Sequence, residues 1–273
     1  MRRVSWSLFK GLIVIALVIA FWETLSLSGA VTQQVLPGPW RVLLRWLHYL
    51  APGHAYDPGR DGNWLYWLSS GELIADLIAS LTRVLLGFLI GAGLALPFGL
   101  AMGASRLCRD LFNPLMQVLR PIPPIAYIPL AILWFGLGDP PAIFLIALGA
   151  FFPVLMNTVT GVSQVDAIFI RAARNLGAGP WPLFRRIILP AAMPYILTGA
   201  RIAMGTAFIV VIVAEMIAVN SGLGYRILEA REYFWSDKVI AGMLTIGLTG
   251  LVIDIGMNRL SVHLLRWHPS TET

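Results

Sequence analysis

The sequence predicts an all-α integral membrane protein with about six transmembrane helices. Hydrophobic residues make up 58% of the 273-residue chain and charged residues only 12%, whereas an average soluble domain contains about 25% charged residues. Mean hydropathy is +0.76. Three stretches, 84–105, 121–138 and 140–165, contain no charged residue. Each is close to or above the roughly 20 apolar residues that a spanning helix needs, so a soluble globular class is excluded.

The first expected span, about residues 8–29, follows a basic start and has the layout of a signal peptide. Bulky Trp22 and charged Glu23 follow its apolar run, so we expect a helix that is retained. The expected organisation is an N-terminal transmembrane helix at 1–35, an outer interfacial segment and loop at 36–74, a transmembrane core at 75–262 that includes a polar hairpin at 166–190, and a tail at 263–273.

The outer segment contains an amphipathic stretch, LPGPWRVLLRWLHYL. Pro37 and Pro39 favour the start of a short helix there, with Trp40 and several leucines on one side and arginines towards the other. That pattern is typical of a helix lying in the membrane interface. Residues 51–63 are rich in Pro, Gly and Asp and predict a loop, and residues 221–238 form a second outer amphipathic piece.

The last two expected spans, about 192–219 and 239–262, contain charged residues, which are costly inside a membrane. Arg201 and Glu215 are 14 residues apart in sequence, about 21 Å along one helix, and cannot pair within it. Arg201 lies near the inner start of its span and can extend towards the membrane surface. We expect Glu215 to meet Arg226 or Arg231 and to help set an outer gate.

Other polar groups in the expected spans are candidates for a pathway or for helix packing. Asp254 could pair with Arg259 or with a neighbouring helix. Arg120 precedes a proline-broken PIPP stretch, and non-helical backbone at membrane depth is tolerated only against protein or water. A cation there would favour an anion, although structural packing remains equally open. The candidates for the pathway or gate are Arg120, Pro123, Asn157, Glu215 and Asn220.

The distribution of charge predicts the orientation of the chain. With the N-terminus inside, the inner segments hold more Arg and Lys than the outer ones, as cytoplasmic loops do. Both termini are therefore expected in the cytoplasm. The same rule accounts for the net charge of +6 without nucleic acid as a partner. We expect no metal site, because Cys108 is the single cysteine and the four histidines, which include His268, lie in loops or at span ends.

The polar hairpin RAARNLGAGPWPLFRRIILP stands out in this apolar chain. Asp166 favours the start of a short helix, and Gly177 is placed as its left-handed C-terminal cap. Pro182 suits the first residue of a second helix, which Pro190 would interrupt before the next span. Leu183 and its apolar neighbours should face away from the two adjacent arginines. From composition alone, those arginines could equally hold anionic lipid headgroups.

The spacing of this hairpin resembles the loop of bacterial ABC importer permeases, whose pattern is Glu-Ala-Ala, a Gly four residues on, then Ile-x-Leu-Pro. Arg171 stands where that family has an acid. The resemblance extends from about Leu36 to His268 through SLTRVLLGFLIGAGLALPFGLAMG, LRPIPPIAYIPLAILWFGLGD and VAEMIAVNSGLGY, and it is to the nitrate, sulfonate and taurine branch. The residues in the family's register are Ala172, Ala173, Gly177, Ile187, Leu189 and Pro190.

This resemblance implies the transmembrane domain of a type I importer in the bacterial inner membrane. It implies that two copies work with two cytoplasmic ATPases, which bind ATP and Mg, and with a periplasmic binding protein, among membrane lipids. The hairpin would be the coupling helix, and the substrate a small anion, with sulfonates such as taurine ahead of nitrate, bicarbonate or a vitamin precursor. The expected ATPase-coupling residues are Arg171, Ala172, Ala173, Gly177, Ala178, Trp181, Arg185, Arg186, Ile187, Leu189 and Pro190.

Motifs for chemistry in this chain itself are missing from the sequence. A phosphate-binding loop needs Gly-Lys followed by Ser or Thr, but the two lysines, Lys10 and Lys238, follow Phe9 and Asp237. Neither Gly-x-Ser-x-Gly nor His-Glu-x-x-His occurs. We therefore expect a non-enzymatic translocation subunit without a cofactor of its own. An ATP-independent channel or secondary carrier is the alternative class, against which the coupling-type hairpin argues.

Overall fold

The computed structural model describes residues 2–51, 53, 54, 57, 63, 64, 67 and 70–266, with side chains from Lys10 onward except at residue 12. Every regular element in these ranges is helical, as the sequence predicts. Most of the loop expected at 51–63, the cation Arg60 and the terminal His268 lie outside the described residues.

Four helical stretches in the described part are long and apolar enough to cross a membrane: Glu72–Ala104, Asp139–Ser163, Pro180–Ala218 and Ser236–Leu264. A bent pair, Arg106–Leu119 and Pro124–Phe135, makes a fifth if it counts as one span. The first expected span is helical, and its apolar part Ile13–Leu27 is shorter than these. The elements are α1 (Arg2–Leu27), α2 (Pro39–Leu50), α5 (Glu72–Ala104), α6 (Arg106–Leu119), a 3₁₀ turn (Pro124–Tyr127), α7 (Ile128–Phe135), α8 (Asp139–Ser163), α9 (Ala167–Asn175), α10 (Pro180–Leu183), a π turn (Phe184–Ile188), α11 (Leu189–Ala218), α12 (Leu223–Glu232) and α13 (Ser236–Leu264).

The span expected at 121–138 is not one continuous helix. The chain bends by 81° between α6 and the helical pair that follows, and α7 has only 8 residues, about 12 Å of helix. Three prolines explain the break: Pro121, Pro123 and Pro124 lack an N–H, and each disfavours helical backbone in the residue before it. The absence of charge over 18 residues therefore indicated an apolar segment but not a continuous helix.

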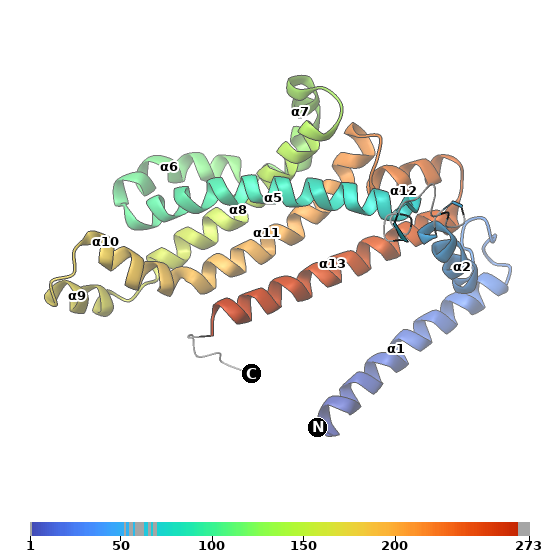
Figure 1. Ribbon diagram of the computed structural model, residues 1–273, viewed down its shortest axis with the longest axis horizontal. Coiled ribbons are helices and arrows are strands. Elements are labelled where there is room, and N and C mark those ends of the chain that lie inside the picture. Colours follow the sequence, from blue (N-terminus) through green and yellow to red (C-terminus); the bar gives the residue numbers. More distant parts are fainter. Residues whose placement is uncertain are drawn as a thin grey trace. The chain divides into compact units, whose positions relative to one another are not determined.

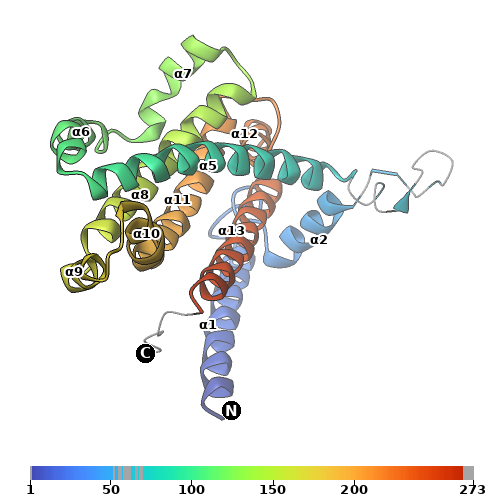
Figure 2. The same ribbon diagram turned by 60° about the vertical axis from the view of Figure 1, so that its left-hand side comes forward.

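The chain forms two compact units, and the larger comprises Ala79–Asn220 with Leu248–Thr273. In it α8 and α11 lie side by side along most of their length, and α9 and α10 lie together at one end of that pair (Figures 1 and 2). The core is built from small and medium apolar side chains of four helices, so the backbones approach closely. Its buried members are Ala92, Ala95, Met102, Met116, Ala150, Val154, Leu155 and Ala203.

The contact of α5 with α8 depends on glycine. A Cβ built on Gly91 would lie 2.3 Å from the carbonyl oxygen of Ala147, whereas one on Gly93 would meet nothing within 4 Å. We expect Gly91→Ala to lower the melting temperature of the detergent-solubilised protein, because two backbones would have to separate. Gly93→Ala, in the same helix, should leave it unchanged or raise stability by up to about 1 kcal/mol. Equal melting temperatures for both variants would contradict the close approach.

The smaller unit comprises Met1–Ile78 with Ser221–Gly247. The predicted helix after Pro37 is confirmed as α2. Val42 and Tyr49 are buried, while Trp40 is 65% exposed. The apolar face of α2 that we expect to enter the membrane interface is therefore the exposed face. Burial raises the pKa of Tyr49, and its hydroxyl has no partner within the described residues. Arg226 is partly buried, which works against its charge, yet its hydrogen bond to Asp76 raises its pKa above the ordinary value.

Candidate functional site

The polar hairpin forms as the sequence predicts in its first half. The side chain of Asp166 caps α9 by accepting a hydrogen bond from the amide of Ile168 at 2.8 Å. After α9, Gly177 has φ +81°. The amide of Ala178 donates to the carbonyl of Ala173 at 3.0 Å, and that of Gly177 to Arg174 at 2.9 Å. This is the Schellman arrangement, which ends a helix sharply and reverses the chain.

The second half of the hairpin differs from the prediction. Its helix begins at Pro180 rather than Pro182, and Pro190 does not interrupt it, because Pro180–Ala218 is one continuous 39-residue helix. The π turn Phe184–Ile188 lies directly before Pro190. A π turn spaces its hydrogen bonds one residue wider, which relieves the clash that a proline ring makes with the preceding helical turn. The second helix of the hairpin and the span are therefore one continuous element.

The tip of the hairpin exposes large apolar side chains. Leu176 is 89% exposed and Trp181 66%, and Ile168 and Phe169 are also exposed. Trp181 stacks on Phe184 with ring centroids 6.0 Å apart. The sequence reasoning included Trp181 but missed Leu176; its place directly before the capping Gly177 was the available signal. Large apolar side chains exposed together at the turn of a hairpin are candidates for an interaction surface.

The predicted polar and small coupling residues surround this tip. Arg171 is exposed, and its Nε donates only to the carbonyl of Ala167 in its own helix, at 3.3 Å. Arg185 and Arg186 are exposed whereas Leu183 is buried, and with Trp181 the two arginines line an open hollow of about 380 Å³. Of the remaining predicted residues, Ala172 is exposed and Ala173 is buried in α9. The others are partly buried: Ala178 in the turn between the helices, and Ile187, Leu189 and Pro190 in the second helix.

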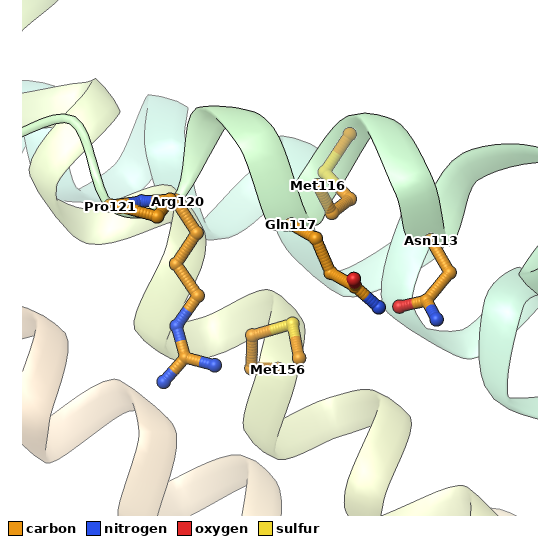
Figure 3. A pocket seen from close by; sticks show the side chains of 6 residues that line it. All are labelled: Asn113, Met116, Gln117, Arg120, Pro121 and Met156. Atoms are coloured by element: carbon orange, nitrogen blue, oxygen red, sulfur yellow. The ribbon is translucent and has the colours of Figure 1, made fainter.

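A second feature lies at the break between α6 and the 3₁₀ turn. A cavity of about 280 Å³ there is lined by Arg120, Asn113, Gln117, two methionines and Pro121 (Figure 3). Arg120 is the C-terminal cap residue of α6. In Figure 3 its guanidinium and the two amide groups extend from the same side of α6, towards Met156 of α8. The structure thus gathers polar groups around one of the predicted pathway residues.

The other predicted pathway residues lie elsewhere. Asn157 donates to the carbonyl of Pro153 in its own helix at 2.8 Å, and a Cβ on Gly199 would touch it, so it packs where α8 meets α11. Pro123 precedes the 3₁₀ turn, and Asn220 is exposed after α11. Within the described ranges, no group of three or more His, Cys, Asp or Glu side chains could hold a metal ion.

The expected pairing of Glu215 with Arg226 or Arg231 is wrong. Glu215 is fully buried and accepts from Arg83 Nη1 at 2.6 Å and from the hydroxyl of Ser80. Arg83 also donates to Asp139 at 2.7 Å. Both Arg83 and Ser80 belong to α5. This helix begins at Glu72, before the charge-free stretch that starts at residue 84. The network ties α5, α8 and α11 together.

Arg201 and Asp254, in the last two spans, pair with each other. Arg201 of α11 makes two hydrogen bonds of 2.7 Å to the carboxylate of Asp254 in α13, which confirms the option of a neighbouring helix for Asp254. Both side chains are about half exposed. Since an exposed ion pair is unfavourable against lipid tails, this face is suited to protein or water.

Comparisons with known proteins agree on one family. Residues 73–266 match the family model described as "Binding-protein-dependent transport system inner membrane component". A putative aliphatic sulfonates transport permease of Bacillus subtilis (strain 168) is 38% identical over 271 residues, 99% of this chain and 91% of that protein. The taurine transport system permease of Escherichia coli (strain K12) is 35% identical over 254 residues, 93% and 89% of the two chains. A chain of the inward-facing MetNI methionine ABC transporter shares the fold, with a TM-score of 0.63, 18% identity and coverage of 72% of this chain and 97% of that chain.

Proposed function

Because this chain is an ABC transporter permease that belongs to the family of binding-protein-dependent transport system inner membrane components, we propose that it imports a small anion by alternating access. Two copies form the translocation unit. Two ATPase subunits bind ATP and Mg on the cytoplasmic side, where both termini of this chain lie, and a periplasmic binding protein delivers the substrate.

The exposed tip of the hairpin carries this proposal. Leu176 and Trp181 are large apolar side chains held in the open by a Schellman turn and a short helix. A surface of this kind is stable in water only when a partner covers it. The arginines beside it would pair with acidic residues at the rim of an apolar groove on the partner. The hairpin is therefore the coupling helix, and the groove belongs to the ATPase.

The continuous helix from Pro180 to Ala218 supports the mechanism. At 1.5 Å per residue it is about 58 Å long, enough to reach from a cytoplasmic partner across the bilayer. Movement of the docked tip is transmitted along α11, and then to α8, which packs closely against it. Closure of the ATPases on ATP thus reopens the paired permeases towards the periplasm.

The substrate is proposed from the relatives. Names of similar permeases refer to aliphatic sulfonates and taurine, and a sulfonate is a small, permanently charged anion. We therefore place an aliphatic sulfonate such as taurine first, with nitrate or bicarbonate as the alternative within the same family.

Uptake into proteoliposomes tests the proposal. Permease, ATPase and binding protein from the same source are reconstituted together, and radiolabelled taurine is supplied with and without ATP inside. We expect accumulation only when all three proteins and ATP are present. Accumulation without the ATPase would instead favour a channel or a secondary carrier.

Charge reversal at Arg185 and Arg186 should weaken the complex with the ATPase. Both side chains are exposed beside the tip, so Arg185→Glu with Arg186→Glu should reduce co-purification without unfolding the permease. The matched control reverses two exposed arginines outside the hairpin, Arg106→Glu with Arg259→Glu. If the hairpin only anchors lipid, the complex stays intact and only its membrane behaviour changes.

A further inference from the structure

We propose that the cavity lined by Asn113, Gln117 and Arg120 is a binding site for a small oxyanion within the membrane part of the protein. It takes the sulfonate group of the transported substrate on its way through the permease. This inference rests on the proposed transport function and deepens it, because it gives the anion a site on this chain in addition to the one on the binding protein.

The polar side chains at this cavity have unused hydrogen-bond donors. The side chains of Arg120, Asn113 and Gln117 make no hydrogen bond or ion pair with any other residue that the structure describes. A guanidinium has five N–H donors and each amide has two. Arg83 and Arg201, which lie in long apolar helices of the larger unit, are both paired with carboxylates. Arg120 therefore differs from them in being available to a ligand.

The position of the cavity suits a site on a transport pathway. It lies where an apolar segment is broken by the 81° bend after α6. Irregular backbone at membrane depth is tolerated where it is buried in protein or lines water, and broken helices are where transporters commonly place their substrate sites. A cation near the last carbonyls of a helix can also simply complement its dipole. The side chain of Arg120, however, makes no hydrogen bond to those carbonyls, and its guanidinium extends towards Met156 of α8 (Figure 3).

The chemistry of the lining selects a small oxyanion. Three groups that donate hydrogen bonds, one of them positively charged, face a volume of about 280 Å³. A sulfonate offers three acceptor oxygens and a permanent negative charge, and an Arg pairs with such groups through two parallel hydrogen bonds. Met116 and Met156 supply adaptable apolar walls for a short aliphatic chain. The set has no acidic group that would attract a cation.

Uptake by variants of Arg120 tests the site in the reconstituted complex. We expect Arg120→Gln to reduce ATP-driven uptake of radiolabelled taurine about tenfold or more, the usual effect of losing a charged hydrogen-bond partner. Arg120→Lys should keep part of the rate, and Asn113→Ala with Gln117→Ala should reduce it less than Arg120→Gln does. The control is Arg106→Gln, which removes an exposed cation at the other end of α6 and should leave uptake unchanged.

Direct binding distinguishes an anion site from a purely structural role of Arg120. The permease–ATPase complex, without binding protein and in lipid-free detergent, is dialysed against radiolabelled taurine, nitrate or bicarbonate. We expect saturable binding of at least one of them, lost in Arg120→Gln and kept in Arg106→Gln.

Four outcomes would overturn the inference. The first is normal uptake by Arg120→Gln, and the second is that none of the three anions binds. The third is an equal loss of uptake in Arg120→Gln and Arg120→Lys together with a lowered melting temperature. The fourth is a phospholipid in place of the anion, found by mass spectrometry on the wild type but not on Arg120→Gln. The proposed transport function is tested separately, by whether uptake by the wild-type complex depends on ATP.

Discussion

Glu215→Gln is expected to destabilise the larger unit by about 3 kcal/mol. Breaking a buried ion pair leaves the other charge without its partner, which typically costs 3–5 kcal/mol, and here Arg83 keeps one carboxylate, Asp139, so the lower end applies. Glu215 is 0% exposed and Arg83 6%. The substitution keeps the shape of the side chain, so the effect reports on charge and hydrogen bonding rather than on volume.

The measurement is thermal unfolding of the permease in detergent, with Asp139→Asn as the matched control. Asp139 binds the same arginine at almost the same distance but is 60% exposed, so its loss should cost about 1 kcal/mol or less. Combining Glu215→Leu with Arg83→Leu should destabilise less than the two single changes added together. If Glu215→Gln and Asp139→Asn lower the stability equally, burial does not determine how much each ion pair contributes.

Leu176→Asp is expected to abolish ATP-driven uptake while the permease stays folded. Leu176 is 89% exposed, so a charge there is harmless to the free protein. In a docked complex the same carboxylate would be desolvated in an apolar groove. Losing such a central anchor typically costs at least 2 kcal/mol of binding, about thirtyfold in affinity. Co-purification with the ATPase should fall with uptake.

The neighbouring residues provide controls for this result. Asn175→Asp adds the same charge one residue away without removing an apolar anchor, and should retain most of the uptake. Gly177→Trp should behave like Leu176→Asp for a different reason, since φ +81° at Gly177 strains any ordinary residue and would displace the tip. If Leu176→Asp takes up substrate normally, the tip does not dock the ATPase.

The hairpin could be predicted from sequence because its signals are local. Asp166 and Gly177 act through hydrogen bonds to residues within five positions, and such caps depend little on the rest of the fold. The small amphipathic helix α2 was predicted for the same reason, from Pro39 and a helical periodicity.

Features that depend on distant residues were not predictable in this way. The partner of Glu215 is 132 residues away in sequence, and a periodic pattern does not say which of several arginines lies opposite. The prolines of PIPP indicated non-helical backbone after Arg120, but the uniform apolar composition did not reveal the 81° bend there. Pro190 was read as an interruption since sequence alone does not reveal a π turn that accommodates it.

The π turn at Phe184–Ile188 also sets the rotational phase between the hairpin and α11. An α-helix turns by about 100° per residue, and a π turn holds one residue more than the α turn that it replaces. If the same residues instead formed a regular α-helix, the apolar tip would point about 100° away from its present direction around the axis of the span. The π turn thus sets the direction in which a displacement of the tip is transmitted to the span.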